Sequence, residues 1–268
     1  MWSHRPSFTI TLLCASRFVR FYNWVFRRIP AWPLVAPNLS ASCHTIPSGN
    51  SVLDAVFVEP VDQSARTSVL ICHGIGEVAT QWFPIQRFFA DAGISSLVFD
   101  YSGYGRSTGR PSWMQCEQDA ISAFELLKRL APSNPITLLG FSLGTGVVPA
   151  IVNRVEADRL VLCAGYSSFR AAAHAVGIPV FLSPLVPPIW DAAASLPNCE
   201  LPVLVVHSTS DGLFPAQMAR DIVSSCGGNA ELLLVHGIGH NEPFYKPDLS
   251  YWGPIITWLG KESGAGPQ

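Results

Sequence analysis

The sequence has few charged residues, and this scarcity excludes several classes of protein. Only 13% of its 268 residues are Asp, Glu, Lys or Arg, about half of the roughly 25% that is usual for a soluble domain. A hydrophobic fraction of 49% at such low charge excludes intrinsic disorder for most of the chain. The net charge of −2 excludes a generally basic surface, so we expect no nucleic-acid partner.

Long apolar runs and cysteine motifs are also missing. No stretch of 18 or more uninterrupted apolar residues occurs, so the sequence predicts no membrane-spanning helix. The seven cysteines include no CxxC pair and no zinc-ligand spacing, so we expect no metal site. An odd and scattered set of cysteines is typical of a reducing compartment, which favours a cytoplasmic location.

Acidic residues are absent from the first 53 positions, which contain five arginines and therefore carry a charge of +5 against −7 for the remainder. Residues 8–15 form a short apolar run. Residues 16–29 interleave aromatic residues with arginines, with the spacing of an amphipathic helix that has one basic face. We therefore treat residues 1–40 as a separate amino-terminal segment.

Three roles are open for this segment. In the first, residues 8–29 lie in a membrane interface, which makes the protein cytoplasmic with peripheral membrane contact. In the second, they form an extra helix packed on the core. In the third, they are a targeting or secretion signal, and the protein is then secreted or targeted.

From residue 41 onward, short apolar runs alternate with helical patterns. The sequence predicts strands at 41–46, 51–59, 68–73, 95–100, 136–141, 159–165, 203–208 and 230–236, and helices at 79–92, 113–130, 143–155, 215–225 and 247–259. Such alternation indicates an α/β domain at 41–262, with a mostly parallel sheet covered by helices on both faces, followed by a short tail at 263–268. Its chemistry is expected at the carboxyl ends of the strands.

Two serines match the pattern G-x-S-x-G. Ser142, in Gly-Phe-Ser-Leu-Gly, has a predicted strand directly before it and a predicted helix directly after it. This is the context of a nucleophile elbow, a sharp turn that lifts a hydroxyl above the sheet edge. Ser107, in Gly-Arg-Ser-Thr-Gly, lies in a polar glycine-rich loop and is interpreted as a loop serine.

A serine nucleophile needs a base, and the base needs an orienting carboxylate. Asp211 follows the strand 203–208, and His240 follows the strand 230–236. Parallel strands end at one sheet edge, so we expect Ser142, Asp211 and His240 to meet there as a catalytic triad. Other histidines and carboxylates near strand ends receive other interpretations: His73 as part of a structural or oxyanion loop, His207 and His236 as satisfied buried histidines, and Asp100 as an anchor of the loop after it. Asp191, in the connection 167–200, is a weak alternative to Asp211 as the acid.

The segment His73-Gly-Ile-Gly-Glu77 follows the first buried strand and precedes a helix. It is the expected source of one oxyanion donor, the backbone N–H of Ile75, and Leu143, the residue after the nucleophile, supplies the other. Glu77 is expected to be a solvated residue near a helix start.

One long connection, residues 167–200, interrupts the alternation. It contains the apolar, proline-rich run 178–190, which is too long for a tight turn and too apolar for an idle surface loop. We interpret it as a short cap beside the site. Its residues Phe181, Leu185 and Ile189, together with Gly74, are the predicted substrate-binding residues.

At this point the motifs resemble those of a known superfamily. The segments HGIGE (73–77), FDYSGYGRSTG (99–109), GFSLG (140–144) and GIGHNE (237–242), with the Asp211 loop, resemble the α/β-hydrolases. They are most similar to the branch of monoglyceride lipases, serine aminopeptidase-like hydrolases and small membrane-associated depalmitoylases. The resemblance covers roughly residues 51–260 and implies the same three triad residues. The cap is shorter than in monoglyceride lipases, and the amino-terminal cysteine cluster of the depalmitoylases is reduced here to Cys14.

The predicted activity is that of a serine hydrolase. Ser142, Asp211 and His240 would cleave carboxylic ester or thioester bonds of apolar acyl groups through an acyl-enzyme, and this chemistry needs no cofactor. The expected partner is a small-molecule or lipid-like ester. Two alternatives remain open: an acyltransferase that uses the same triad, and a non-catalytic binding protein with this fold.

Overall fold

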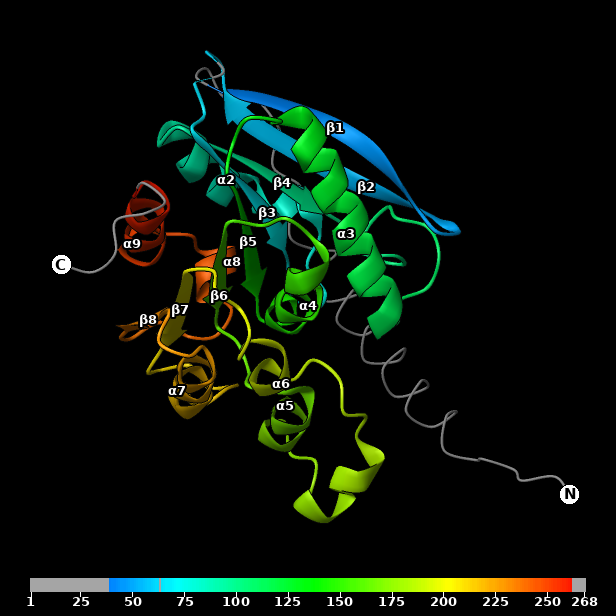
Figure 1. The fold of residues 1–268 in the computed structure, drawn as a ribbon, viewed down its shortest axis with the longest axis vertical. Helices are drawn as coiled ribbons and strands as arrows, with labels where there is room; N and C mark the ends of the chain where they lie inside the picture. Colours follow the sequence, from blue (N-terminus) through cyan, green and yellow to red (C-terminus); the bar gives the residue numbers. More distant parts are fainter. Residues whose placement is uncertain (1–38, 63, 262–268) are drawn as a thin grey trace, which may run out of the picture.

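The structure is a computed structural model that describes residues 39–62 and 64–261. The predictions for residues 8–29 and for the tail at 263–268 fall on residues outside these ranges. Within the described part, a single eight-stranded sheet organises the chain, as Figure 1 shows.

The sheet has the strand order β1-β2-β4-β3-β5-β6-β7-β8. The strands are β1 (Leu39–Ser48), β2 (Ser51–Pro60), β3 (Thr67–Cys72), β4 (Ile94–Phe99), β5 (Ile136–Phe141), β6 (Arg159–Cys163), β7 (Val203–Ser208) and β8 (Ala230–Val235). All neighbours from β4 to β8 pair in parallel, whereas β2 runs antiparallel to β1 and to β4. The predicted α/β class with a mostly parallel sheet is therefore confirmed.

Burial explains why these segments form strands. Every residue of β4, β5, β6 and β7 is buried, as expected for continuous apolar runs that are covered on both faces. The edge strand β8 is only half-buried. Between β1 and β2 the hairpin turns at Gly49, whose φ of 56° is in the left-handed region that favours glycine.

Helices cover the two faces of the sheet and enclose two hydrophobic cores. On one face lie α3 (Trp113–Leu130), α4 (Gly144–Ile151) and α7 (Ala216–Ser225), and the other face carries α2 (Phe83–Asp91), α8 (Glu242–Tyr245) and α9 (Leu249–Leu259). The second core is rich in aromatic residues: the Trp82 indole lies 5.6 Å from the Phe141 ring and 5.9 Å from Trp252, centroid to centroid.

Two helices have other boundaries than the predicted ones, and one short helix was not predicted. The predicted helix 79–92 begins as a 3-10 turn, η1 (Ala79–Trp82), and becomes α2 at Phe83, where Pro84 occupies the first helical turn. The predicted helix 143–155 ends as α4 at Ile151 and continues as the 3-10 turn η2 (Val152–Arg154). The four-residue helix α8 was not predicted, because so short an element has no measurable periodicity.

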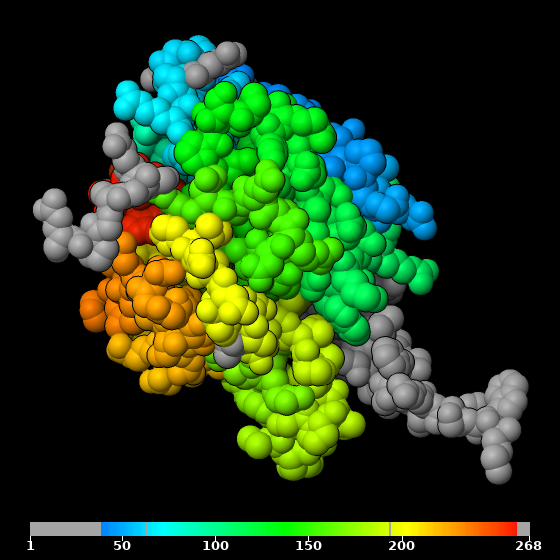
Figure 2. Space-filling view, viewed as in Figure 1, coloured from blue at the N-terminus to red at the C-terminus, as the bar shows by residue number. Residues whose placement is uncertain are grey.

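The connection 167–200 forms a small cap made of α5 (Phe169–Ala175), η3 (Val180–Leu185) and α6 (Ala192–Ser195). Figure 2 shows this yellow-green region as a lobe that projects from the body of the molecule. None of the residues of η3 is buried. Trp190, at 9% exposure, anchors the end of the lobe: its indole N–H donates to Glu117 Oε1 on α3 over 3.2 Å.

Candidate active site

Ser142 sits on a strained turn between β5 and α4. Its φ is +50°, in the left-handed region that is uncommon for residues other than glycine. Flanking glycines make the turn possible: a Cβ on Gly140 would lie 2.5 Å from the Gly144 carbonyl oxygen, and a Cβ on Gly144 would lie 1.8 Å from the Cys72 carbonyl oxygen. The serine N–H donates to the Cys163 carbonyl over 2.9 Å, which fixes the turn to β6.

The structure brings Ser142, His240 and Asp211 together in one chain of hydrogen bonds. Ser142 Oγ lies 2.9 Å from His240 Nε2, and His240 Nδ1 lies 2.7 Å from Asp211 Oδ2. A carboxylate only accepts, so His240 Nδ1 carries the proton and Nε2 is left to accept the hydrogen of Ser142. Asp211 and His240 lie 69 and 98 positions after the serine in the chain, and they meet it at the carboxyl edge of the sheet.

Asp211 is held in its ionised form by several donors. Its side chain is 1% exposed, and this burial by itself raises the pKa. The hydrogen bond and charge interaction with His240, together with the backbone donors, lower the pKa by more than burial raises it. The pKa of Asp211 therefore lies below its usual range. Its Oδ1 accepts from the N–H groups of Leu213 and Phe214, each at 2.8 Å. The carboxylate is therefore positioned to orient an imidazolium ring.

Aromatic rings enclose the imidazole of His240, whose side chain is 8% exposed. The Phe214 ring meets it edge to face at 5.1 Å and 89°, and the Phe141 ring lies 6.2 Å away. Phe214 in turn packs against Tyr166 at 5.4 Å. These rings restrict the rotation of the imidazole and exclude water from its sides.

The two predicted oxyanion donors come from segments in close contact. Gly144 packs against the carbonyl of Cys72, so the turn that contains Leu143 abuts the end of β3, from which the loop to Ile75 begins. The backbone N–H groups of Leu143 and Ile75 donate to no other group among the described residues. Unused N–H groups at such a position are free to bind a developing oxyanion.

Ser107 and Asp100 have the structural roles expected of them. Ser107 Oγ donates to the Asp100 carbonyl over 2.6 Å and accepts the N–H of Asp54 over 2.9 Å. Asp100 accepts the N–H of Ala79 over 2.7 Å and that of Arg106 over 3.2 Å. Asp191 caps α6 by accepting the N–H of Ala194 over 3.3 Å, so it lies outside the chain of bonds at Ser142.

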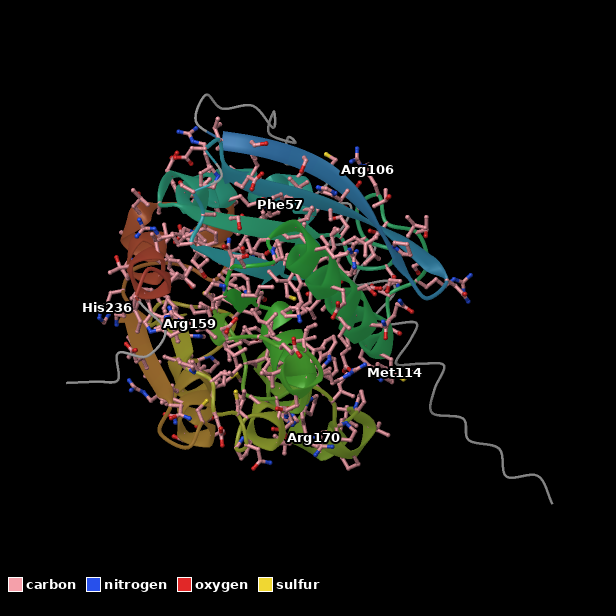
Figure 3. The ribbon with its side chains drawn as sticks, turned by 45° about the horizontal axis from the view of Figure 1, so that its top comes forward. Phe57, Arg106, Met114, Arg159, Arg170 and His236 are labelled. Carbon is pink, nitrogen blue, oxygen red and sulfur yellow. The ribbon has the colours of Figure 1, made fainter. Side chains whose placement is uncertain are left out.

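Two structural interpretations from the sequence are wrong, and a third holds only in part. Glu77 is not solvated but 2% exposed, because Trp82 and the backbone of Gly74 enclose its carboxylate. His236 is exposed at the end of the edge strand β8, as Figure 3 shows, and bonds to Thr209 Oγ1 over 2.9 Å. His207 is buried, with Nε2 3.0 Å from the Phe214 carbonyl, but its Nδ1 has no partner in the described chain.

The predicted substrate-binding residues have unequal surroundings. Gly74 is buried, and its N–H donates to Glu77 rather than toward a substrate. Phe181 and Leu185 are exposed at 79% and 65% of their surfaces, and Ile189 is half-buried and packs against one of the two hydrophobic cores. The cap therefore presents apolar side chains at the surface rather than around an enclosed cavity.

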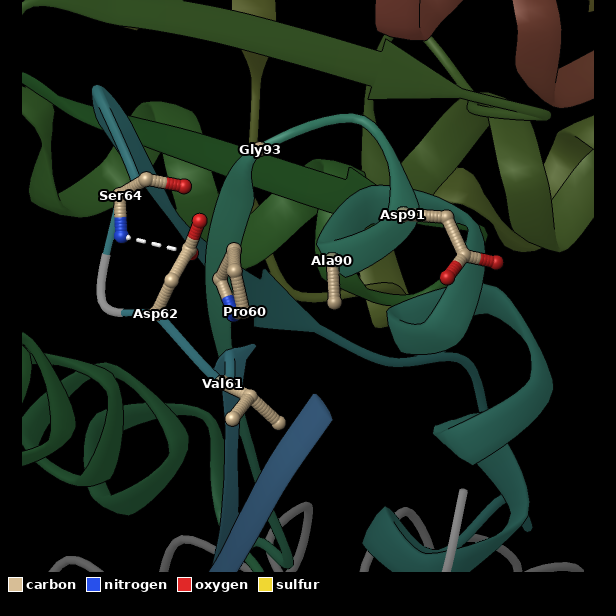
Figure 4. Close-up of a pocket in the computed structure, with 7 residues that line it drawn as sticks. All are labelled: Pro60, Val61, Asp62, Ser64, Ala90, Asp91 and Gly93. Carbon is tan, nitrogen blue, oxygen red and sulfur yellow. Dashed lines mark hydrogen bonds between the residues drawn. The ribbon is translucent and has the colours of Figure 1, made fainter. Parts of the chain in front are cut away.

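A surface depression at the opposite edge of the sheet has no part in this arrangement. Figure 4 shows it between the end of β2 at Pro60 and the end of α2 at Asp91, with Gly93 just before β4. Its polar lining is locally satisfied, since Asp62 Oδ1 accepts the N–H of Ser64 over 3.1 Å. Within residues 39–62 and 64–261, no group of His, Cys, Asp and Glu has the arrangement of a metal site.

Sequence reasoning missed Glu77 and the aromatic enclosure of His240. A signal for Glu77 was present: it is the only charged residue between His73 and Arg87. A lone carboxylate in an uncharged stretch is often buried with specific partners. The aromatic contacts had no such signal, because Phe141 in β5 and Phe214 after β7 are far apart in the chain and approach His240 only in the folded protein.

Comparisons with known proteins agree with this architecture. Residues 63–190 match the family described as serine aminopeptidase, S33. This match includes Ser142 and ends before Asp211. The uncharacterised protein Rv2307c of Mycobacterium tuberculosis (strain ATCC 25618 / H37Rv) is 28% identical over 251 residues, which cover 89% of this chain and 88% of that protein.

The lysophosphatidylserine lipase ABHD12 of Macaca fascicularis is 26% identical over 205 residues, 68% of this chain and 52% of that lipase. The chain thus spans about half the length of this relative. Among solved structures, the esterase Pf2001 of Pyrococcus furiosus superposes with a TM-score of 0.69 at 18% identity, covering 87% of this chain and 99% of that one. A soluble variant of the monoglyceride lipase of Saccharomyces cerevisiae has a TM-score of 0.67 at 16% identity, covering 88% and 99%.

The sheet order and the similar solved structures show that the chain has the α/β-hydrolase fold. Part of the chain matches a serine hydrolase family, and the chain is similar to proteins named as lipases and esterases. Among the described residues, no helix combines the length and the hydropathy that crossing a bilayer requires.

Proposed function

We propose that the protein is a serine hydrolase that cleaves carboxylic ester or thioester bonds of apolar acyl groups. The observation that carries the proposal is the continuous chain of hydrogen bonds from buried Asp211 through His240 to Ser142 on a strained elbow. A serine that only shapes a turn needs neither a base at 2.9 Å nor a carboxylate behind that base.

Each group would act in a defined step. His240 Nε2 takes the proton of Ser142 as Oγ attacks the acyl carbon, and Asp211 stabilises the resulting imidazolium. The N–H groups of Ile75 and Leu143 bind the oxyanion of the tetrahedral intermediate. His240 then protonates the leaving alcohol or thiol, and a water activated by the same histidine releases the acid.

The apolar surface of the cap supports the proposal that the acyl group or the leaving group of the substrate is apolar. Phe181 and Leu185 are exposed on the lobe that follows β6, and β6 ends beside Ser142. Two similar proteins are named as lipases of a lysophospholipid and of monoglycerides, and both of these substrates are lipid esters. We extend the same class to this chain and retain peripheral membrane contact through residues 8–29 and a cytoplasmic location as parts of the proposal.

The acyltransferase alternative uses the same residues. It differs only in whether an alcohol or amine, rather than water, reaches the acyl-enzyme. A non-catalytic protein of this fold usually lacks a member of the triad, and this chain has all three residue types. Hydrolysis therefore remains the function that the geometry supports best.

The test is an acyl chain-length series of p-nitrophenyl esters and matched acyl-thioesters, measured on the wild type, Ser142→Ala and Ser107→Ala. We expect turnover that rises with acyl length, is abolished in Ser142→Ala and stays within about threefold of the wild type in Ser107→Ala. Turnover only on acetate and butyrate would contradict the apolar acyl group. Undiminished turnover in Ser142→Ala would contradict the nucleophile.

A further inference from the structure

Glu77 is a buried carboxylate beside the loop that carries Ile75. Its Oε2 accepts the backbone N–H of Gly74 over 2.8 Å and the indole N–H of Trp82 over 3.0 Å. It forms no salt bridge with any described residue. A buried carboxyl group with no cation beside it costs stability, whether it is ionised or keeps a proton that the unfolded chain would release, so this position calls for an explanation beyond packing.

The neighbouring peptide is held from its other side by His73. His73 Nδ1 lies 2.8 Å from the Gly74 carbonyl oxygen. Burial lowers the pKa of His73 to about 4, so the ring is neutral at ordinary pH and has one N–H. A carbonyl only accepts, so that N–H is on Nδ1, and Nε2 is the ring nitrogen left without a partner.

These two bonds fix the direction of the Ile75 N–H. The Gly74 carbonyl and the Ile75 N–H belong to the same trans peptide, in which C=O and N–H point in opposite directions. His73 holds the carbonyl end, and Glu77 holds the N–H of Gly74 one peptide earlier. The N–H of Ile75 is thereby turned away from His73.

Gly74 packs directly against the side chain of Glu77. A Cβ on Gly74 would lie 2.5 Å from Glu77 Oε1, so a larger residue at position 74 would displace the carboxyl group. Gly76 follows with a φ of +79°, and the chain then enters η1, whose Trp82 is fully buried. The carboxylate thus links the loop to the aromatic core.

We propose that Glu77 is a positioning residue that keeps the Ile75 N–H directed at the oxyanion by accepting the Gly74 N–H and anchoring it to Trp82. The inference rests on the proposed function, since it deepens the account of the same site. A preorganised donor stabilises the transition state and not the bound substrate, so its misalignment lowers kcat and leaves KM unchanged. Removal of a whole oxyanion donor typically lowers kcat about 10²- to 10³-fold. Misalignment of a donor that is still present should lower kcat by a smaller factor.

The test compares two conservative variants. Glu77→Asp retracts the carboxylate by one methylene and breaks the bond to Gly74, whereas Glu77→Gln retains an oxygen acceptor at the same reach. We expect Glu77→Asp to lower kcat on a p-nitrophenyl ester about 10- to 100-fold at unchanged KM. We expect Glu77→Gln to stay within about threefold of the wild type.

A transition-state analogue gives a second readout. A trifluoromethyl ketone with the best acyl chain forms a tetrahedral adduct with the serine, and its Ki should rise in Glu77→Asp by the same factor as kcat falls. The matched control is Asp119→Asn, another buried carboxylate, whose hydrogen bonds are to Ser48, Ser102 and Gln115 rather than to residues 73–77. It should lower the melting temperature without changing kcat or Ki.

The outcomes separate this inference from the proposed function. Wild-type turnover that is lost in Ser142→Ala supports the function independently of Glu77. On that basis, a wild-type kcat in Glu77→Asp, an equal loss in Glu77→Gln, or a loss matched by Asp119→Asn would each overturn the positioning role. Absence of turnover in the wild type would instead overturn the proposed function.

Discussion

At the scale of single residues, the chemistry of the candidate site depends on position more than on residue type. The chain has seven histidines, and of those in the described ranges only His240 is bonded to both a serine and a carboxylate. His207 lies 3.7 Å from the same Asp211 oxygen, yet its Nε2 is closer to the Phe214 carbonyl, at 3.0 Å. His207 therefore tethers the acid loop to β7 rather than acting as a base.

Replacement of Asp211 by asparagine should show what the negative charge of Asp211 contributes, apart from the packing of its side chain. The asparagine side chain would keep the volume and the contacts with Leu213 and Phe214, but its neutral amide cannot stabilise an imidazolium as a carboxylate does. We expect Asp211→Asn to lower kcat about 10⁴-fold with little change in KM. Steady-state kinetics with a p-nitrophenyl ester measures this, and a loss below tenfold would argue against Asp211 as the orienting acid.

Glu77 also makes stability depend on pH. Burial raises its pKa to about 8 from 4.5, so between these values the folded protein keeps a proton that the unfolded chain has lost, and stability falls as pH rises. Asp100, with a pKa raised by burial to about 6, acts in the same direction below pH 6, and His73, with a pKa lowered to about 4, acts in the opposite direction below pH 6.5. Above pH 6.5 the contribution of Glu77 remains.

We therefore expect the melting temperature of the wild type to fall between pH 6.5 and pH 8, because the folded state keeps the Glu77 proton whereas the unfolded chain has released it. Glu77→Gln cannot ionise and should show a smaller fall over the same interval. Thermal unfolding of both proteins in matched buffers measures the difference. Parallel curves for the two proteins would show that Glu77 does not titrate in this window.

At the scale of elements, buried polar networks connect the loops at the carboxyl edge to the helices behind them. Asp119 on α3 accepts from Ser102 in the loop after β4 and from Ser48 Oγ, 2.6 Å away at the end of β1. At the other edge, Arg159 of β6, labelled in Figure 3, donates to the Trp258 and Leu259 carbonyls at the end of α9 over 3.3 and 3.2 Å. A cation at a helix carboxyl terminus is favourable.

The cap is the element whose role is most open to test. Since Phe181 and Leu185 are exposed, replacing both by serine should change stability by no more than about 0.5 kcal/mol. If they contact the acyl chain, KM for long-chain esters should rise several-fold while butyrate turnover is unchanged. Val61→Ser is the matched control, since Val61 is 58% exposed at the opposite sheet edge. Equal KM values for long esters in the cap variant and the wild type would show that Phe181 and Leu185 do not contact the acyl chain.

At the scale of the whole molecule, the regular alternation of strands and helices made the fold predictable. Segments 113–130, 136–141 and 203–208 have in the structure the bounds that periodicity and turn residues predict. Since parallel strands end at one edge, the positions of Ser142, Asp211 and His240 after their strands were sufficient to expect them together.

Other features depend on tertiary packing and left no local pattern. The burial of Glu77 depends on Trp82 and on the turn at Gly74, and neither periodicity nor composition encodes that contact. The exposure of Phe181 and Leu185 follows from a cap that projects beyond the sheet, whereas an apolar run by itself predicts burial. The exposed His236 follows from the position of β8 at the sheet edge, which strand order decides.

The central claim is that Ser142 carries the acyl group during turnover. The most direct measurement is the intact mass of the protein after reaction with a fluorophosphonate, followed by localisation of the label to a peptide. We expect one phosphonyl group per chain, on the peptide that contains Ser142, no label in Ser142→Ala, and loss of ester turnover in proportion to labelling. A label on another residue, or full turnover by the labelled protein, would contradict the account.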